Sequence, residues 1–158
     1  MLDRDYSHRD VIDKLGIKPG YALAVDVASA SLDFDPALRE RVLNRLGRPL
    51  ATTDEQLDLI LVLMDDTVDE TAILVRWRPR LKPPGGIWLL TPKRGWAGYV
   101  DQRRLIQAGR AAGVVDNKVC SVSESMSAMR FVIRRTDRMI SATAPEGLRV
   151  QDENSLPT

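Results

Sequence analysis

Short apolar runs alternate along this sequence with longer amphipathic segments, and this alternation limits the folds that the chain can adopt. Three runs are nearly continuous in apolar residues, namely 21–27, 57–64 and 87–90. Such runs are typical of strands that are buried on both faces of a sheet. Leu50 and Ala51 indicate a further short edge strand. Segments 114–122 and 128–134 alternate more clearly around Ser-Glu-Ser-Met-Ser, so they predict an antiparallel hairpin.

The amphipathic segments carry residues that begin and end helices. Three of them end just before a glycine, namely 7–15, 35–46 and 101–112. Glycine most easily takes the left-handed conformation that follows a helix. Their first residues, Ser7, Asp35 and Asp101, are suited to cap a first turn. A fourth helix is predicted from Thr67, which has capping-box spacing to Glu70, up to the Pro-Pro-Gly-Gly at 83–86.

Strands and helices in this order predict an α/β domain of three layers. We expect a Rossmann-like, mainly parallel sheet with right-handed crossovers that ends in the antiparallel hairpin. A chain of 158 residues can bury a real core in one domain, which we place at residues 1–135. From 136 to 158 the sequence loses its apolar periodicity, and this stretch is predicted to be a flexible tail.

The cysteine content and the longest apolar stretches predict the compartment. Cys120 is the single cysteine, which excludes a disulfide scaffold. The first residues are charged where a signal peptide needs an apolar run. The longest apolar stretches are far shorter than the roughly 20 residues of a membrane-spanning helix. The sequence therefore predicts a cytoplasmic protein that does not associate with membranes.

Charge is distributed unevenly, although the net charge is only +1. Residues 1–70 contain 15 acidic and 8 basic side chains, whereas residues 71–158 contain 7 and 15. One interpretation is that the two halves attract each other and the bases are solvated. The other is that the basic half faces an anion, and association with nucleic acid through this half is one form of it.

Candidate ligand-binding residues follow the apolar runs. Ligands of open parallel sheets bind beyond the carboxyl ends of the strands, so the side chains at these ends are candidates. They are Asp26, Ser29, Ser31, Asp65, Asp66, Lys93, Arg94 and Trp96. The bases could meet a carboxylate or phosphate while the indole covers an apolar part of the ligand. The alternative is that Asp65 and Asp66 cap a helix and that Lys93 and Arg94 are solvated.

Motifs of well-known cofactor and metal sites do not occur. Residues 28–31 contain no glycine, and neither G-x-G-x-x-G after a strand nor the P-loop pattern is present, so a dinucleotide is not expected. His8 is the single histidine, and a metal site or catalytic triad would need partners for it. Cys120 is predicted to be a buried, inert thiol. The cofactor, if any, is left undetermined.

Two resemblances follow from particular segments. LKPPGGIWLL at 81–90 resembles the helix-to-strand joint of class I S-adenosylmethionine-dependent methyltransferases, which also end in an antiparallel hairpin. This resemblance implies a related sheet topology. The glycine-rich loop that holds the methionine part of the cofactor in those enzymes is missing after the first strand of this chain.

A closer resemblance is to the bacterial family named domain of unknown function 3052. Three segments carry it: KLGIKPGYALAV at 14–25, GGIWLLTPK at 85–93 and GVVDNKVCSVSESMSAMRFVIRR at 113–135. Together they span nearly the whole predicted domain. The family implies no established activity, substrate or cofactor.

Three functional hypotheses remain open from the sequence. The first is a non-catalytic α/β domain that binds a small anionic ligand or a protein partner at the carboxyl edge of its sheet. The second is a divergent methyltransferase, in which Asp26 or Asp65 would contact hydroxyl or amine groups of S-adenosylmethionine. The third is association with nucleic acid through the basic half, which would weaken steeply with salt.

Overall fold

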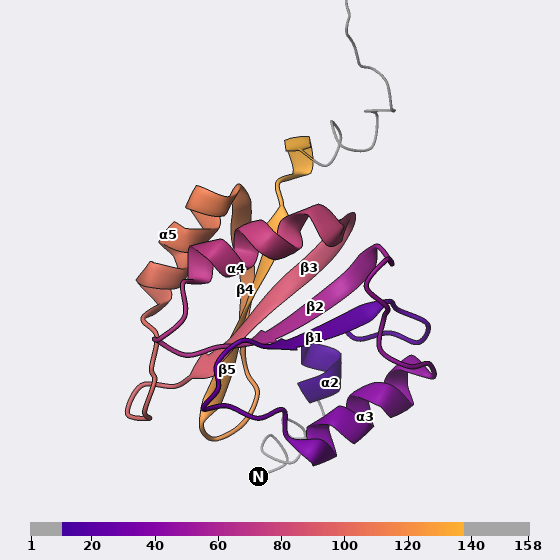
Figure 1. Ribbon diagram of the computed structural model, residues 1–158, viewed down its shortest axis with the longest axis horizontal. Helices are drawn as coiled ribbons and strands as arrows, with labels where there is room; N and C mark the ends of the chain where they lie inside the picture. Colours follow the sequence, from indigo (N-terminus) through magenta and orange to yellow (C-terminus); the bar gives the residue numbers. More distant parts are fainter. Residues whose placement is uncertain (1–10, 138–158) are drawn as a thin grey trace, which may run out of the picture.

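Five strands form one mixed sheet in the structure, a computed structural model that describes residues 11–137 (Figure 1). The strands are β1 (Leu23–Val27), β2 (Leu57–Leu63), β3 (Leu81–Pro92), β4 (Val114–Ser121) and β5 (Met126–Ile133). Their order across the sheet is β1-β2-β3-β5-β4. Strands β1, β2 and β3 pair in parallel, and β5 pairs antiparallel with both β3 and β4. The predicted parallel core with a closing hairpin is confirmed.

Helices cover both faces of this sheet. They are α2 (Val11–Lys14), α3 (Pro36–Leu46), α4 (Glu70–Trp77) and α5 (Gln102–Ala112), with a 3₁₀ turn η1 (Arg78–Arg80) after α4. The Asp35 carboxylate accepts the N–H of Leu38 at 3.0 Å, and Gly47 follows α3 with φ of 67°. Helix α5 is capped in the same way by Asp101. None of the helices between residues 11 and 137 is long and apolar enough to cross a membrane.

Helix α4 begins two residues later than predicted. Its cap is Asp69, whose carboxylate accepts the N–H of Ala72 at 3.1 Å. Thr67 belongs to the preceding turn, because its N–H and hydroxyl both donate to Asp65. The predicted capping box is therefore wrong, since the hydrogen bonds of Thr67 are already used one turn earlier.

The Pro-Pro-Gly-Gly at 83–86 lies inside β3 rather than between a helix and a strand. An irregularity in the pairing of β2 with β3 accommodates it: Leu57 pairs with Leu81, and the next pair is Leu59 with Gly86. Prolines are tolerated at such bulges because they donate no ladder hydrogen bond. The strand therefore begins six residues before the apolar run that predicted it.

Both faces of the central strands are buried. On β2, Leu59 and Leu61 pack with α2 and α3, whereas Ile60 and Val62 pack with α4 and α5. Trp77 and Trp88 are buried on opposite sides of the sheet. This double burial explains why the strands read as continuous apolar runs.

Helices α3 and α4 lie on opposite faces, although β1, β2 and β3 follow each other in one direction across the sheet (Figure 1). The β1-α3-β2 and β2-α4-β3 crossovers must then have opposite hands. The prediction of right-handed crossovers therefore holds for only one of the two. After α3 the chain passes the outer edge of β1, where the N–H of Ala51 donates to Leu23 at 2.9 Å. Ala51 contacts this edge, but Leu50 and Ala51 do not form the predicted strand.

Some predictions concern residues outside the described range. Ser7 and His8, at the start of the first predicted helix, are among them, and that helix is described only as Val11–Lys14. Of the predicted tail, residues 136 and 137 are helical. Residues 138–158 lie outside the described part of the chain.

Candidate functional site

The loop after β1 is joined to the loop after β2 by side-chain hydrogen bonds. The hydroxyl of Ser31 donates to Oδ2 of Asp65 at 2.7 Å, and the Ser29 and Ser31 hydroxyls lie 3.1 Å apart. Ser29 is buried. The structure thus brings together three of the predicted site residues, because parallel strands end at the same edge of a sheet.

Asp65 directs its hydrogen-bonding capacity into the protein. It is buried, and its Oδ1 accepts the N–H of Thr67 at 3.0 Å and the Thr67 hydroxyl at 2.5 Å. The hydroxyls of Thr67 and Ser31 hold the pKa of Asp65 well below its usual range. The carboxylate is therefore charged, and it fixes the turn that leads to α4.

The loop after β3 folds over this cluster. Gly98 has φ of 86°, and a Cβ built on it would lie 2.8 Å from Cβ of Asp65. The backbone N–H of Asp66 donates to Gly98 at 3.1 Å, while the side chain of Asp66 is exposed. Glycine is needed here for both its conformation and its lack of a side chain.

Asp26 has a different environment. Its Oδ2 accepts the indole N–H of Trp77 at 2.9 Å and lies 3.9 Å from Nη1 of Arg76. It therefore joins β1 to α4. Like Asp65, it makes its described hydrogen bonds inside the fold.

The two bases after β3 lie beside the hairpin. The ammonium of Lys93 donates to Oγ of Ser121 at 2.7 Å. The guanidinium of Arg94 lies 5.7 Å from the ring centroid of Tyr99. Trp96 is about half exposed, at 49%. These contacts hold the two charges at the carboxyl end of β3, as their place in the sequence predicts.

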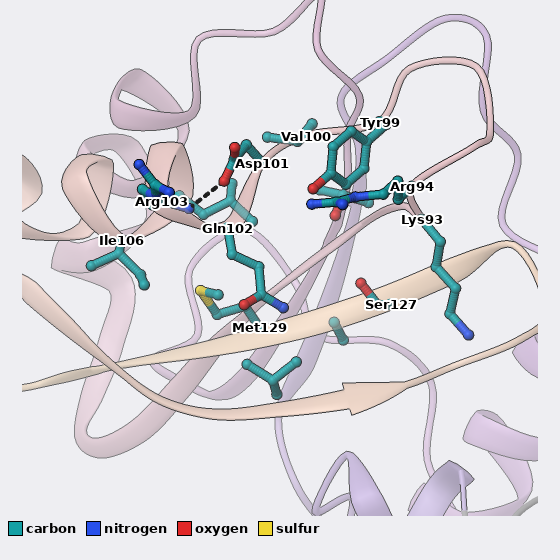
Figure 2. A pocket seen from close by; sticks show the side chains of 14 residues that line it. Lys93, Arg94, Tyr99, Val100, Asp101, Gln102, Arg103, Ile106, Ser127 and Met129 are labelled. Carbon is teal, nitrogen blue, oxygen red and sulfur yellow. Dashed lines mark hydrogen bonds between the residues drawn. The ribbon is translucent and has the colours of Figure 1, made fainter.

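A cavity of about 580 Å³ opens beside these bases, between the start of α5 and the hairpin (Figure 2). We call it the α5 pocket. Arg94 and Gln102 extend toward its middle, and Lys93 and Arg103 stand at its two ends. Its further lining includes Tyr99, Asp101, Ile106, Val119, Ser127 and Met129. The pocket thus combines charged groups at its rim with an apolar floor.

The lining residues that were not predicted include Tyr99, Gln102, Arg103 and Ser127. Asp101 and Pro92 indicate in sequence where α5 begins and β3 ends. Nothing local to either segment shows that the first turn of α5 faces the start of β5. That juxtaposition follows from the placement of β5 between β3 and β4.

Ser31 borders a second cavity, of about 530 Å³, on the opposite face of the sheet. Leu32, Phe34, Leu63, Leu90 and Met126 make its lining largely apolar. The predicted residues therefore do not surround one site. Lys93 and Arg94 line the α5 pocket, whereas Ser31 borders the cavity beside α3, and the sheet separates the two.

Other reactive groups are few in the described residues. Between 11 and 137 there is no cluster of three or more His, Cys, Asp or Glu side chains that could hold a metal ion. Cys120 is half-buried, and burial raises the pKa of its thiol despite the nearby Lys14 and Lys118. A raised pKa keeps the thiol protonated at neutral pH.

Solved structures similar to this one include several methyltransferases. Mitomycin 7-O-methyltransferase matches with a TM-score of 0.56 and 13% identity, over 82% of this chain and 54% of that enzyme. An O-methyltransferase of neocarzinostatin biosynthesis matches with a TM-score of 0.52 and 16% identity, over 84% of this chain and 57% of that enzyme. A methyltransferase from Aquifex aeolicus matches with a TM-score of 0.51 and 11% identity, over 79% of this chain and 89% of that protein. The chain thus has a Rossmann-like, methyltransferase-like fold, and it spans about half the length of the first enzyme.

The family follows from the sequence comparison. Residues 12–135 match the family model described as "Protein of unknown function (DUF3052)", and the chain belongs to this family. A search of curated proteins finds no match.

Proposed function

We propose that the protein is a binding domain that takes up a small anionic ligand in the α5 pocket. The observation that carries this proposal is the charge of the pocket: Lys93, Arg94 and Arg103 line it against one acid among its described lining residues, Asp101. A cavity of about 580 Å³ is within the range of small-molecule sites.

The start of α5 adds side-chain donors to the pocket. Gln102 and Arg103 line it, while the amino end of the helix is capped by the Asp101 carboxylate, which accepts the N–H of Arg103 at 2.9 Å. The contact of Lys93 with Ser121 and of Arg94 with Tyr99 restricts both bases before a ligand arrives. Restricted donors lose less entropy on binding. Each charged hydrogen bond contributes about 1.5–3 kcal/mol.

The test is the double substitution Lys93→Ala with Arg94→Ala in the full chain. Inorganic phosphate and citrate are titrated into the ¹⁵N-labelled protein at constant ionic strength. We expect saturable shifts of the Gln102 and Ser127 amides that the double variant loses, with a thermal midpoint nearly unchanged because exposed charges contribute little to folding. Arg39→Ala with Arg110→Ala removes the same charge from exposed positions of α3 and α5 and should bind normally.

Three results would contradict the proposal: neither anion shifts these amides saturably, the double variant binds as the wild type does, or it loses much of its stability. The last result would make the two bases structural.

The methyltransferase-like fold supports one other candidate, a divergent methyltransferase. Calorimetry with S-adenosylmethionine distinguishes the two, because saturable micromolar binding would favour the enzyme. The hydrogen bonds of Asp26 and Asp65 within the fold weigh against their predicted contact with the cofactor. A nucleic-acid partner would instead be shown by binding that weakens steeply with salt.

A further inference from the structure

The α5 pocket contains a buried hydroxyl that hydrogen-bonds to no other group between residues 11 and 137. It belongs to Thr91, which is only 3% exposed and lines the pocket. The other buried polar residues of this range each hydrogen-bond to another side chain; they are Ser29, Asp65 and Glu70. A buried hydroxyl without a partner destabilises the folded state. The fold itself therefore gains nothing from this group.

The alternation of β3 turns Thr91 toward α5. Ile87 and Leu89 pack on the α4 and α5 side of the sheet, and Thr91 follows them with the same period of two. Ser127 lies directly opposite Thr91 on β5 and also lines the pocket. Its hydroxyl, too, makes no hydrogen bond with a described group. Two available hydroxyls thus lie side by side on the pocket floor, with Cβ atoms about 5 Å apart.

Ser121 extends this row of hydroxyls onto β4. It lies opposite Ser127 on the neighbouring strand. Its hydroxyl accepts a hydrogen bond from the ammonium of Lys93 at 2.7 Å and donates to the carbonyl of Ser123 at 3.3 Å. The hydrogen bonds of Ser121 are therefore made within the protein, and they fix a positive charge at one end of the row. The hydroxyls of Ser127 and Thr91 follow this charge across the sheet.

Two longer side chains extend toward the middle of the same pocket, Arg94 and Gln102 (Figure 2). The side-chain amide of Gln102 makes no hydrogen bond with a residue of the described range. An amide both donates and accepts, as a hydroxyl does. A ligand in this pocket therefore meets two bases and, next to them, neutral groups that can donate and accept.

We propose that the α5 pocket binds a small hydroxycarboxylate, a compound with a hydroxyl close to its carboxylate. Lys93 and Arg94 hold the carboxylate. The ligand hydroxyl donates to one of the hydroxyls of Thr91 and Ser127 and accepts from the other, which makes these two the specificity-determining residues. This inference rests on the function proposed above, the uptake of a small anion, and adds which class of anion is preferred. An anion without the hydroxyl leaves Thr91 unpartnered and binds more weakly.

Malate and succinate are the probes, because both are dianions at neutral pH and they differ by one hydroxyl. Each is titrated into the ¹⁵N-labelled full chain at constant ionic strength, malate as either enantiomer. We expect saturable shifts of the Thr91, Gln102 and Ser127 amides. The better enantiomer of malate should bind about three- to tenfold more tightly than succinate, which is the worth of one neutral hydrogen bond.

Substitutions at position 91 assign this preference to one side chain. Thr91→Val removes the hydroxyl but nearly keeps the shape, and should reduce the affinity for malate to that for succinate without changing the latter. Thr91→Ser keeps a hydroxyl and should keep the preference for malate. Thr53→Val is the matched control at an exposed position, and it should bind both dianions as the wild type does.

Thermal unfolding without ligand supplies a second, independent measurement. Thr91→Val should raise the thermal midpoint by a few degrees, because it replaces an unpartnered buried hydroxyl by a methyl group. A lower midpoint would show that the hydroxyl already has a partner in the ligand-free protein, and would overturn the inference.

The binding results separate this inference from the proposed function. If malate and succinate bind equally, or if Thr91→Val weakens both to the same extent, the preference for a hydroxyl is wrong while the uptake of an anion stands. If neither dianion shifts the amides of this pocket, the inference is overturned as well, and the titrations with phosphate and citrate then decide the proposed function separately.

Discussion

Replacing Gly109 by alanine should destabilise the protein, although alanine is the better helix former. Gly109 lies inside α5, where propensity alone favours alanine by about 1 kcal/mol. In the structure an added Cβ would lie 2.6 Å from Cε2 and 2.8 Å from Cδ2 of Phe131. That ring is fully buried and cannot move aside. Overpacking of this kind costs about 1–3 kcal/mol, and such short distances favour the upper half of that range.

We therefore expect the Gly109→Ala variant to lose about 1–2 kcal/mol of unfolding free energy after the gain in propensity. Urea unfolding followed by circular dichroism measures this loss. Ala111, an exposed residue of the same helix, supplies the matched control, since Ala111→Gly should cost about 1 kcal/mol through propensity alone.

A second background isolates the cause of the loss. In a Phe131→Leu variant the ring is gone, so adding Gly109→Ala should become neutral or stabilising, and the coupling between the two positions should be clear in a double-mutant cycle. A stabilising effect of Gly109→Ala in the wild-type background would refute the packing of α5 against β5 that underlies this reasoning.

Two further predictions concern buried charges. Asp65→Asn keeps the shape of the side chain but removes the charge that accepts three hydrogen bonds, and should cost about 2 kcal/mol at pH 7. Because the pKa of Asp65 is lowered in the folded state, this difference should shrink as the pH falls below about 4, where the unfolded chain takes up the proton. Equal differences in thermal melts at pH 7 and pH 3 would show that the charge is unimportant. Arg104→Gln leaves the buried Glu70 carboxylate without the guanidinium that pairs with it, and should cost about 2 kcal/mol. Adding Glu70→Gln should recover most of this loss in urea unfolding, and no recovery would mean that the pair is not coupled.

Much of the secondary structure could be predicted because its signals are local. Asp35 and Gly47 bound α3 as expected, since a capping carboxylate and a left-handed glycine act on their immediate neighbours. The start of β3 could not be predicted in this way. Prolines 83 and 84 normally interrupt a strand, and only the irregular pairing with β2 accommodates them.

For the candidate site, too, the sequence predicted one part of the arrangement and not the other. The sequence predicted that Lys93 and Arg94 follow a buried strand, and the structure places them on the α5 pocket. It also predicted that Ser31 and Asp65 share the carboxyl edge, and a hydrogen bond joins them. The separation of these groups by the sheet was not predictable, because it depends on the direction in which each loop leaves its strand.

The sequence by itself determined most of the segments that become strands and helices, and therefore the α/β class, because apolar periodicity and capping depend on neighbours along the chain. The tertiary structure alone decided which face each side chain occupies after a bulge, as at Lys118. It also decided that position 109, where α5 lies against Phe131, leaves no space for a Cβ. Both depend on contacts between segments distant in sequence, and no local pattern encodes the distance between two such surfaces.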